Sequence, residues 1–286
     1  MHPIRAVGHV APVPTGRHCD RLMWITPERV FYHGLLGTPA VRTMGSVIVY
    51  AAVEGALRVR VAGGDWQTTT MAVVQPYEPH QVIAQARLID VVKLEAETVD
   101  PAVLPQPLRG SGATDEPELL ERIRAAQRRL ARRNGAPEPG TRFDLEFFGR
   151  PVAGRRIDPR IEAVVERIRM HPAGTTSAQQ HARQVNLSFS RFLHLFKDEI
   201  GVPFRIFRAW KRARDLLHYV NRVSSLAQVA LEAGYPDSTH FSHSIRQVYG
   251  LKPSDIFAGS RRLAIFAQPD PAAAAATGAA ADCTAA

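Results

Sequence analysis

The sequence has few of the features that would place a protein outside the cell or in a membrane. It contains 2 cysteines in 286 residues, Cys19 and Cys283, and that pattern does not indicate a disulfide framework. Outside the alanine-rich end of the chain there is no uncharged apolar run of the roughly 18 residues that a transmembrane helix needs. Residues 1–18 lack the apolar core of a signal peptide. We therefore expect a cytoplasmic protein with no membrane partner.

The sequence also lacks the usual catalytic motifs. It has no Ser/His/Asp order, no glycine-rich phosphate loop and no CxxC with supporting context. His240 and His243 are spaced i,i+3 as metal ligands can be, but their place in the repeat described next accounts for them better. We expect no enzyme activity and no cofactor.

One pattern of residues occurs twice. The first copy is TTSAQQHARQVNLSFSRFLHLFKDEIG at residues 175–201, and the second is SSLAQVALEAGYPDSTHFSHSIRQVYG at residues 224–250. Each predicts a short helix, a tight turn and a longer helix that ends at glycine. Ser177 with Gln180, and Ser225 with Gln228, fit the capping box. The repeat therefore predicts two helix-turn-helix units.

Each longer helix has one apolar face and one polar face. Phe192, Phe196 and Ile200 recur at helical spacing in the first unit, as do Phe241 and Ile245 in the second. The opposite faces carry short or cationic side chains that can reach bases and phosphates. These candidate DNA contacts are Ser190, Arg191, His194 and Lys197 in the first unit, and Ser238, Thr239, Ser242, His243 and Arg246 in the second.

Net charge supports a polyanionic partner. Residues 155–263 hold 18 Lys and Arg against 9 Asp and Glu, whereas residues 1–154 hold 18 against 16 and residues 264–286 hold 2 acids. The excess of basic residues therefore lies on the part with the repeat. Pro203–Val220 is predicted to form one basic helix about 27 Å long, which could hold two readers one DNA turn apart. Arg212 on this helix is a further candidate for phosphate contact.

The repeat region resembles the DNA-binding domain of AraC/XylS-type transcriptional regulators. The match is most specific over AxxxGYxDSTHFSHSIRQVYGLKPSDI in the second unit, and it covers about 100 residues, 158–257. The resemblance implies that Ser190, His194, Ser238, Thr239 and His243 contact bases in double-stranded promoter DNA. It also implies activation through RNA polymerase more often than repression. Both His194 and His243 stand where this family often has arginine.

Residues 41–100 read as short strands. The expected strands are 46–50, 56–61, 65–70, 71–75, 81–85 and 88–94, with a turn at 76–80. Short strands with close turns favour a small barrel or sandwich, and EGALRVRVAGGDWQ followed by QPYEPHQV resembles the cupin-like sensor domain of such regulators. The fold class is therefore α+β. The resemblance implies a small-molecule effector, for which Tyr77 and His80 are the candidate contacts.

A metal-dependent cupin enzyme with an accessory DNA-binding domain is the alternative from another class. His80 matches the second-motif histidine of cupins, but no histidine lies between His33 and His80. One histidine does not make a three- or four-ligand site, so we expect no metal. A constitutive dimeric regulator without an effector is a second alternative.

The remaining segments complete the expected organisation. Residues 116–134 predict a helix whose apolar stripe either forms a homodimer or packs back on the barrel. Residues 135–158 are the expected connection, with an aromatic patch at Phe143, Phe147 and Phe148. We expect a sensor domain at 1–110, a helical linker at 111–157, a DNA-binding domain at 158–263 and a disordered alanine-rich tail at 264–286.

Overall fold

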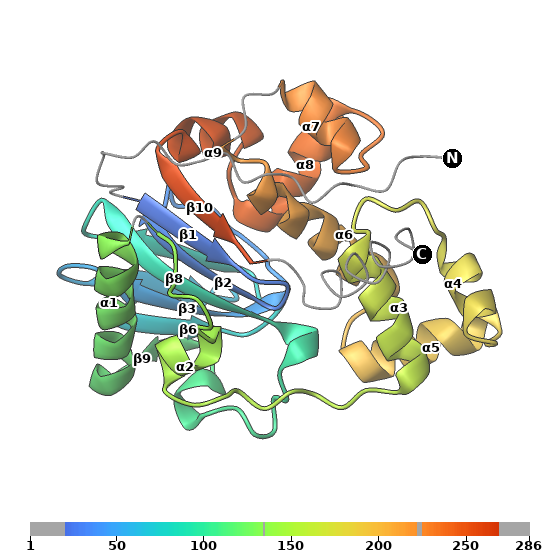
Figure 1. The fold of residues 1–286 in the computed structure, drawn as a ribbon, viewed down its shortest axis with the longest axis horizontal. Helices are drawn as coiled ribbons and strands as arrows, with labels where there is room; N and C mark the ends of the chain where they lie inside the picture. The colour runs from blue at the N-terminus through green and yellow to red at the C-terminus, as the bar shows by residue number, and fades with distance from the viewer. Residues whose placement is uncertain (1–20, 134, 222–224, 269–286) are drawn as a thin grey trace, which may run out of the picture.

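The computed structural model describes residues 21–133, 135–221 and 225–268. A β-rich part comes first and a helical part follows it, as the sequence predicts (Figure 1). The last strand among the described residues, at Leu263–Ala267, returns to the first part. The molecule is therefore α+β, with the helical part packed on one side of the sheet.

Two sheets form the β-rich part. The larger sheet has the strand order β10-β1-β2-β8-β3-β6-β9, and the smaller has the order β5-β4-β7. All neighbouring strands are antiparallel except β1 and β10, which are parallel. The strands are β1 Arg21–Ile25, β2 Arg29–Leu35, β3 Ser46–Ala52, β4 Leu57–Val61, β5 Gln67–Thr69, β6 Met71–Val74, β7 His80–Ala84, β8 Leu88–Glu95, β9 Gly112–Thr114 and β10 Leu263–Ala267.

Both faces of the larger sheet are covered. Every residue of β3 and β6 is buried, which matches their continuous apolar sequences rather than an alternating pattern. One face packs against helices α1 Pro117–Arg132 and α2 Phe143–Phe148. The other face contacts the smaller sheet and the second half of the helical part. The core thus continues from the sheet into the helical part.

The apolar stripe of α1 is buried inside the chain. Leu120, Ile123, Ala126 and Leu130 lie in the same hydrophobic cluster as β3 and β8. Of the two alternatives left open for this stripe, the structure shows the intramolecular one, in which it packs back on the β-rich part. The reason is that the outer face of the sheet is itself apolar and needs cover.

The aromatic patch of the expected connection is part of the core. Phe143 packs 4.9 Å from the Trp24 ring and Phe147 packs 4.7 Å from the Phe31 ring, measured between ring centroids. Asp144 accepts a hydrogen bond from Arg29 Nε at 2.8 Å. The segment therefore docks on the sheet, and only residues 149–158 run between the two parts without a helix or strand.

The helical part contains α3 to α9 and one 3-10 turn. Its elements are α3 Pro159–Met170, α4 Ala178–Gln184, α5 Phe189–Ile200, α6 Phe204–Asp215, the 3-10 turn Leu216–His218, α7 Leu226–Glu232, α8 Ser238–Tyr249 and α9 Pro253–Ser260. Helices α3 to α5 share one core with the start of α6, whereas α7 and α8 share theirs with the sheet. Figure 1 shows the first group standing away from the sheet.

The basic helix predicted at Pro203–Val220 is shorter than expected. It ends at Asp215 and continues as the 3-10 turn Leu216–His218 rather than as α-helix to Val220. Leu216, Leu217 and Val220 are all buried among sheet and helix residues. Because adjacent residues such as Leu216 and Leu217 are both buried, the buried side chains here do not follow the single apolar face of an amphipathic helix.

The predicted disordered tail begins instead with a strand. Leu263–Ala267 pairs in parallel with β1, from Arg21 opposite Leu263 to Ile25 opposite Ala267. Gln268 N then donates to Ile25 O at 2.7 Å. The apolar sequence LAIFA covers an edge that β1 would otherwise expose. The rest of the predicted tail, 269–286, lies outside the described residues.

Candidate DNA-reading surface

Local capping sets the geometry of the first helix-turn-helix unit. Ser177 Oγ accepts from Gln180 N at 3.2 Å and Gln180 Oε1 accepts from Ser177 N at 2.7 Å, which forms the predicted capping box. Asn186 takes a positive φ of 56° in the turn, a conformation that asparagine tolerates better than most residues. Ser188 Oγ then accepts from Arg191 N at 3.3 Å, so that α5 begins at Phe189.

Helix α5 is divided as the sequence predicts. Phe192, Phe196 and Ile200 are buried, and the rings of Phe192 and Phe196 pack on Phe204 at centroid distances of 5.4 and 5.2 Å. The candidate contacts of this unit are all exposed, namely Ser190, Arg191, His194 and Lys197.

The second unit repeats this arrangement with one difference. Ser225 Oγ accepts from Gln228 N at 3.2 Å, but Gln228 Nε2 donates to Glu232 Oε1 at 3.1 Å. The reciprocal half of the predicted capping box is therefore not formed there. At α8 the carboxylate of Asp237 accepts from the backbone N–H groups of Thr239 and His240, both at 2.8 Å. These hydrogen bonds, the one from His240 foremost, lower the pKa of Asp237, whose charge suits a helix N-terminus.

Helix α8 also presents one face and buries the other. Phe241, Ile245 and Val248 are buried in the core shared with the sheet. The predicted contacts Ser238, Thr239, His243 and Arg246 are exposed, and Ser242 is half-buried. The two units thus bring short polar and cationic side chains onto both recognition helices.

Arg212 differs from the other candidate contacts. It is half-buried and its guanidinium donates to the carbonyl of Gly174 at 3.1 Å. Arg208, one turn earlier, donates to the carbonyls of Gly174 and Thr176. Both side chains therefore bind the loop that leads into α4 and do not lie with the exposed face of either recognition helix.

A buried ionic cluster joins helix α6 of the helical part to strand β8 of the sheet. Glu95 at the end of β8 accepts from Trp210 Nε1 at 2.8 Å and from Arg214 Nε at 2.8 Å. Lys211 Nζ lies between Glu95 and Glu97 and pairs with both. In the sequence, Lys211 and Arg214 belong to the excess of basic residues that predicts DNA binding. The sequence did carry one sign of buried charge here. Alternation along β8 puts Lys93 and Glu95 on the same face as the apolar Ile89 and Val91.

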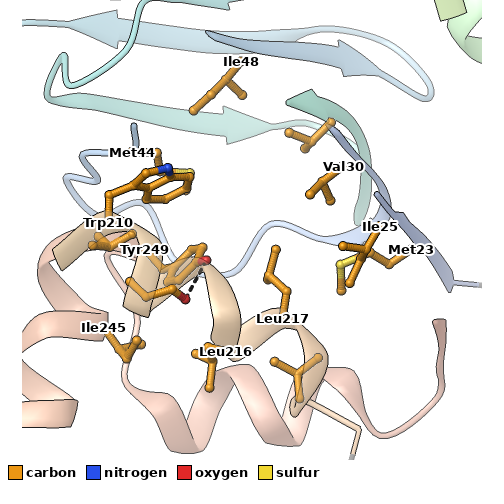
Figure 2. Packing of buried hydrophobic residues seen from close by; sticks show 14 of the residues in the cluster. Met23, Ile25, Val30, Met44, Ile48, Trp210, Leu216, Leu217, Ile245 and Tyr249 are labelled. Carbon is orange, nitrogen blue, oxygen red and sulfur yellow. Dashed lines mark hydrogen bonds between the residues drawn. The ribbon is translucent and has the colours of Figure 1, made fainter. Parts of the chain in front are cut away.

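Apolar packing continues on both sides of that cluster. Figure 2 shows Trp210, Leu216, Leu217 and Tyr249 of the helical part facing Met44, Ile48 and Val30 of the β-rich part. Tyr249 Oη donates to Ala213 O at 3.1 Å, and Thr43 N donates to Val248 O at 3.1 Å. The last turn of α8 is therefore held by a side-chain hydrogen bond to α6 and by a backbone hydrogen bond to the segment that leads into β3.

The two candidate effector contacts lie close to this junction. His80 Nε2 is 2.8 Å from Tyr50 Oη and His80 Nδ1 is 2.8 Å from Glu78 O. Burial lowers the pKa of His80 to about 4, so the ring is neutral at pH 7. Tyr77 Oη is buried and has no hydrogen-bond partner among the described residues. A Cβ at Gly45 would lie 2.7 Å from that oxygen and 2.5 Å from Trp210 Cδ1.

Two buried cations lie in the same region. Arg42 is 4% exposed and Lys93 is 8% exposed. The backbone of Arg42 pairs with that of His80, with both N···O distances 3.0 Å. Lys93 Nζ lies 5.4 Å from the centre of the Tyr249 ring, and burial lowers its pKa to about 8.

The described part of the chain holds neither a metal-binding cluster nor a membrane span. Within 21–133, 135–221 and 225–268 no three His, Cys, Asp or Glu side chains are grouped so as to hold a metal ion. In the same ranges no helix combines the length and apolarity needed to cross a membrane.

Comparisons with known proteins agree with the arrangement of the helical part. A family model described as a helix-turn-helix domain matches residues 181–259, which span both recognition helices. The chain carries the DNA-binding domain of AraC-type transcriptional regulators. The helical part is thus an AraC-type DNA-binding domain, which belongs to a family of transcriptional regulators and not of enzymes, and the resemblance found in the sequence is confirmed for this part. No curated protein sequence matches the chain.

Solved structures extend the likeness of this AraC-type regulator to its β-rich part. An apo point variant of ToxT from Vibrio cholerae strain SCE256 is 10% identical with a TM-score of 0.52, over 81% of this chain and 97% of that one. ToxT from Vibrio cholerae O395 bound to (E)-4-(8-methylnaphthalen-1-yl)but-3-enoic acid is 8% identical with a TM-score of 0.51, over 81% and 98%. At these identities the likeness concerns the fold, a β-sheet domain followed by a helical domain.

Proposed function

We propose that this regulator reads promoter DNA through α5 and α8 together, and that a small carboxylic acid bound between the sheet and the second unit controls it. The observation that carries the proposal is that the two faces of α8 have different surroundings. Its polar face is exposed, whereas its apolar face and last turn are part of the core shared with the sheet. Anything that changes the sheet contact therefore bears on one of the two readers.

The DNA contacts follow from chemistry and exposure. Serine and threonine hydroxyls and histidine nitrogens hydrogen-bond base edges, while arginine and lysine neutralise phosphates. Ser190, His194, Ser238, Thr239 and His243 are the proposed base contacts. Arg191, Lys197 and Arg246 are the proposed phosphate contacts, and half-buried Ser242 is the marginal member of the surface. Activation through RNA polymerase is the proposed outcome at the promoter.

The class of effector follows from the buried cations. Glu95 and Glu97 are already paired with Lys211 and Arg214. Among the described residues no ion pair joins a carboxylate to Arg42 or Lys93. The Arg42 side chain hydrogen-bonds Leu36 O at 3.5 Å and the Tyr50 phenol, and its Nε has no hydrogen-bond partner. Buried charges without a partner are costly. A ligand carboxylate would supply the missing negative charge, and Tyr77 Oη would supply a hydrogen-bond donor.

The surroundings of these cations suit an acid with an apolar body. Met44, Ile48 and Trp210 lie in the core at the same junction. The ToxT structure with the same overall fold was solved with a carboxylic acid bound. In the present structure the Tyr249 ring lies next to Lys93, so the acid would have to displace it. Because Tyr249 ends α8, binding would shift the population between two placements of the second unit.

Calorimetry with decanoate and decanol tests the effector. Decanoate should raise Tm and change affinity for the promoter, and decanol, which has the same chain without the charge, should not. An Arg42→Met, Lys93→Met variant should lose the response, while Arg58→Met, an exposed change on β4, should keep it. No response to any carboxylate in a varied panel, with promoter binding intact, would favour the constitutive regulator instead.

A further inference from the structure

Phe189 is placed unlike any other phenylalanine of the chain. All 12 phenylalanines lie within the described residues, and Phe189, at 49% exposed, is the one among them that is exposed. The others are buried or half-buried in the three hydrophobic clusters or against them. An exposed phenylalanine gives up the apolar burial that stabilises a fold. The fold therefore gives no reason for an aromatic side chain at this position.

The position of Phe189 within α5 is well defined. Ser188 caps the helix, so Phe189 is its first residue. The aromatic cluster beneath the helix is complete without it, because Phe192 and Phe196 pack on Phe204. Ser190 and Arg191, which follow at once, are exposed members of the proposed reading surface. Phe189 thus stands at the N-terminal end of that surface.

This end of a recognition helix is the part that reaches base edges. Helix-turn-helix proteins place the recognition helix in the major groove with its N-terminal residues toward the bases. Each A·T pair presents the C5-methyl group of thymine there, and apolar side chains, phenylalanine among them, contact it.

We propose that Phe189 is a specificity-determining residue that packs on a thymine methyl group in the half-site read by α5. The inference rests on the proposed function, in which α5 enters the major groove. It adds an apolar contact to a reading face otherwise made of serine, histidine and cations. The contact covers a side chain that the fold leaves in water, and it makes the first unit prefer thymine at one position.

Methyl deletion in the DNA, paired with substitution in the full-length protein, tests the contact. The preferred duplex is first selected from a random library with the wild-type protein. Each thymine is then replaced in turn by uracil, which removes the methyl group and keeps the base pair. One replacement should lower wild-type affinity about three- to fivefold, the effect of one buried methyl group. Phe189→Ala should bind the parent duplex more weakly and should not respond to that replacement.

Two variants control the experiment. Ile206→Ala removes an apolar side chain that is 45% exposed on α6, and it should keep the wild-type response to uracil. Phe189→Leu keeps an apolar group and should keep part of the response. An unchanged Tm for Phe189→Ala shows that the fold is intact. If no uracil replacement affects the wild type, or if Phe189→Ala responds as the wild type does, the proposal is overturned.

The experiment gives a different result if α5 does not read bases at all. If neither Ser190→Ala nor His194→Ala alters the selected sequence, α5 does not read bases, and the proposed function fails together with this inference. If those variants alter the sequence but the effect of methyl deletion does not depend on Phe189, the role of Phe189 alone fails. The sensitive thymine must lie in the half-site that Ser190→Ala changes.

Discussion

Trp210 on helix α6 donates its indole N–H to the carboxylate of Glu95 at the end of strand β8, at 2.8 Å and out of contact with water. Burial alone would raise the pKa of Glu95, but Lys211 and Arg214 outweigh it and the pKa is lowered. One carboxylate of the β-rich part thus binds three side chains of the helix that joins the two DNA-reading units. The placement of α6 relative to the sheet depends on it.

Glu95→Ala should therefore destabilise the protein strongly. It leaves Lys211 and Arg214 buried with less negative charge, and removing one member of a buried pair costs about 3–5 kcal/mol. Glu95→Gln, which can keep one hydrogen bond but not the charge, should lie between wild type and Glu95→Ala. Urea unfolding measures the difference. As a control, Glu121→Ala breaks an exposed pair with Arg128 and should cost less than about 1 kcal/mol. Equal losses of stability for Glu95→Ala and Glu121→Ala would refute the role of the cluster.

Lys93 should make stability depend on pH at the alkaline end. Burial lowers its pKa from 10.5 to about 8 in the folded protein. Between these values the unfolded chain binds more protons at Lys93 than the folded protein does, so stability rises with pH. Lys93→Met should be more stable than wild type at pH 7, by up to about 3 kcal/mol, and the difference should shrink from pH 8 to above pH 10. Lys252→Met, an exposed change, should show no such trend, and a constant advantage of Lys93→Met at all pH values would argue against a buried ammonium.

Lys197 and Arg246 should account for part of the salt dependence of DNA binding. Both are exposed on the recognition helices, and a lost phosphate contact weakens binding to all sequences while lowering the salt slope by about 1. Lys197→Ala and Arg246→Ala should behave in this way in titrations at several salt concentrations. Arg212→Ala should instead lower stability, because its guanidinium binds Gly174 O, and leave the slope unchanged. A smaller salt dependence of DNA binding for Arg212→Ala than for the wild type would show that Arg212 contacts a phosphate.

The helix-turn-helix units could be predicted because their signals are local. Ser177, Ser188 and Asp237 cap the helices within three residues of themselves, and the apolar faces of α5 and α8 follow the 3.6-residue period. The exposure of the candidate contacts follows from the same period. None of this requires knowledge of the rest of the chain.

The junction with the sheet could not be predicted from local signals. Glu95 meets Trp210 across 115 residues of sequence, and no local pattern marks such a pair. Basic residues on α6 look alike in sequence whether they are exposed, as Arg205 is, or pair with a buried carboxylate, as Lys211 does. Strand β10 was missed for a related reason, since LAIFA becomes a strand only through its pairing with β1, more than 200 residues earlier.

Selection of preferred DNA sequences by wild type, His194→Ala and His243→Ala tests the central claim, that α5 and α8 read the same duplex, most directly. The wild type should select two short conserved segments about 10 base pairs apart, centre to centre, as two helices in successive major grooves require. His194→Ala should relax base preference in one segment and His243→Ala in the other, each by about 1–3 kcal/mol at most. A single conserved segment, or two variants that change the same segment, would contradict the account.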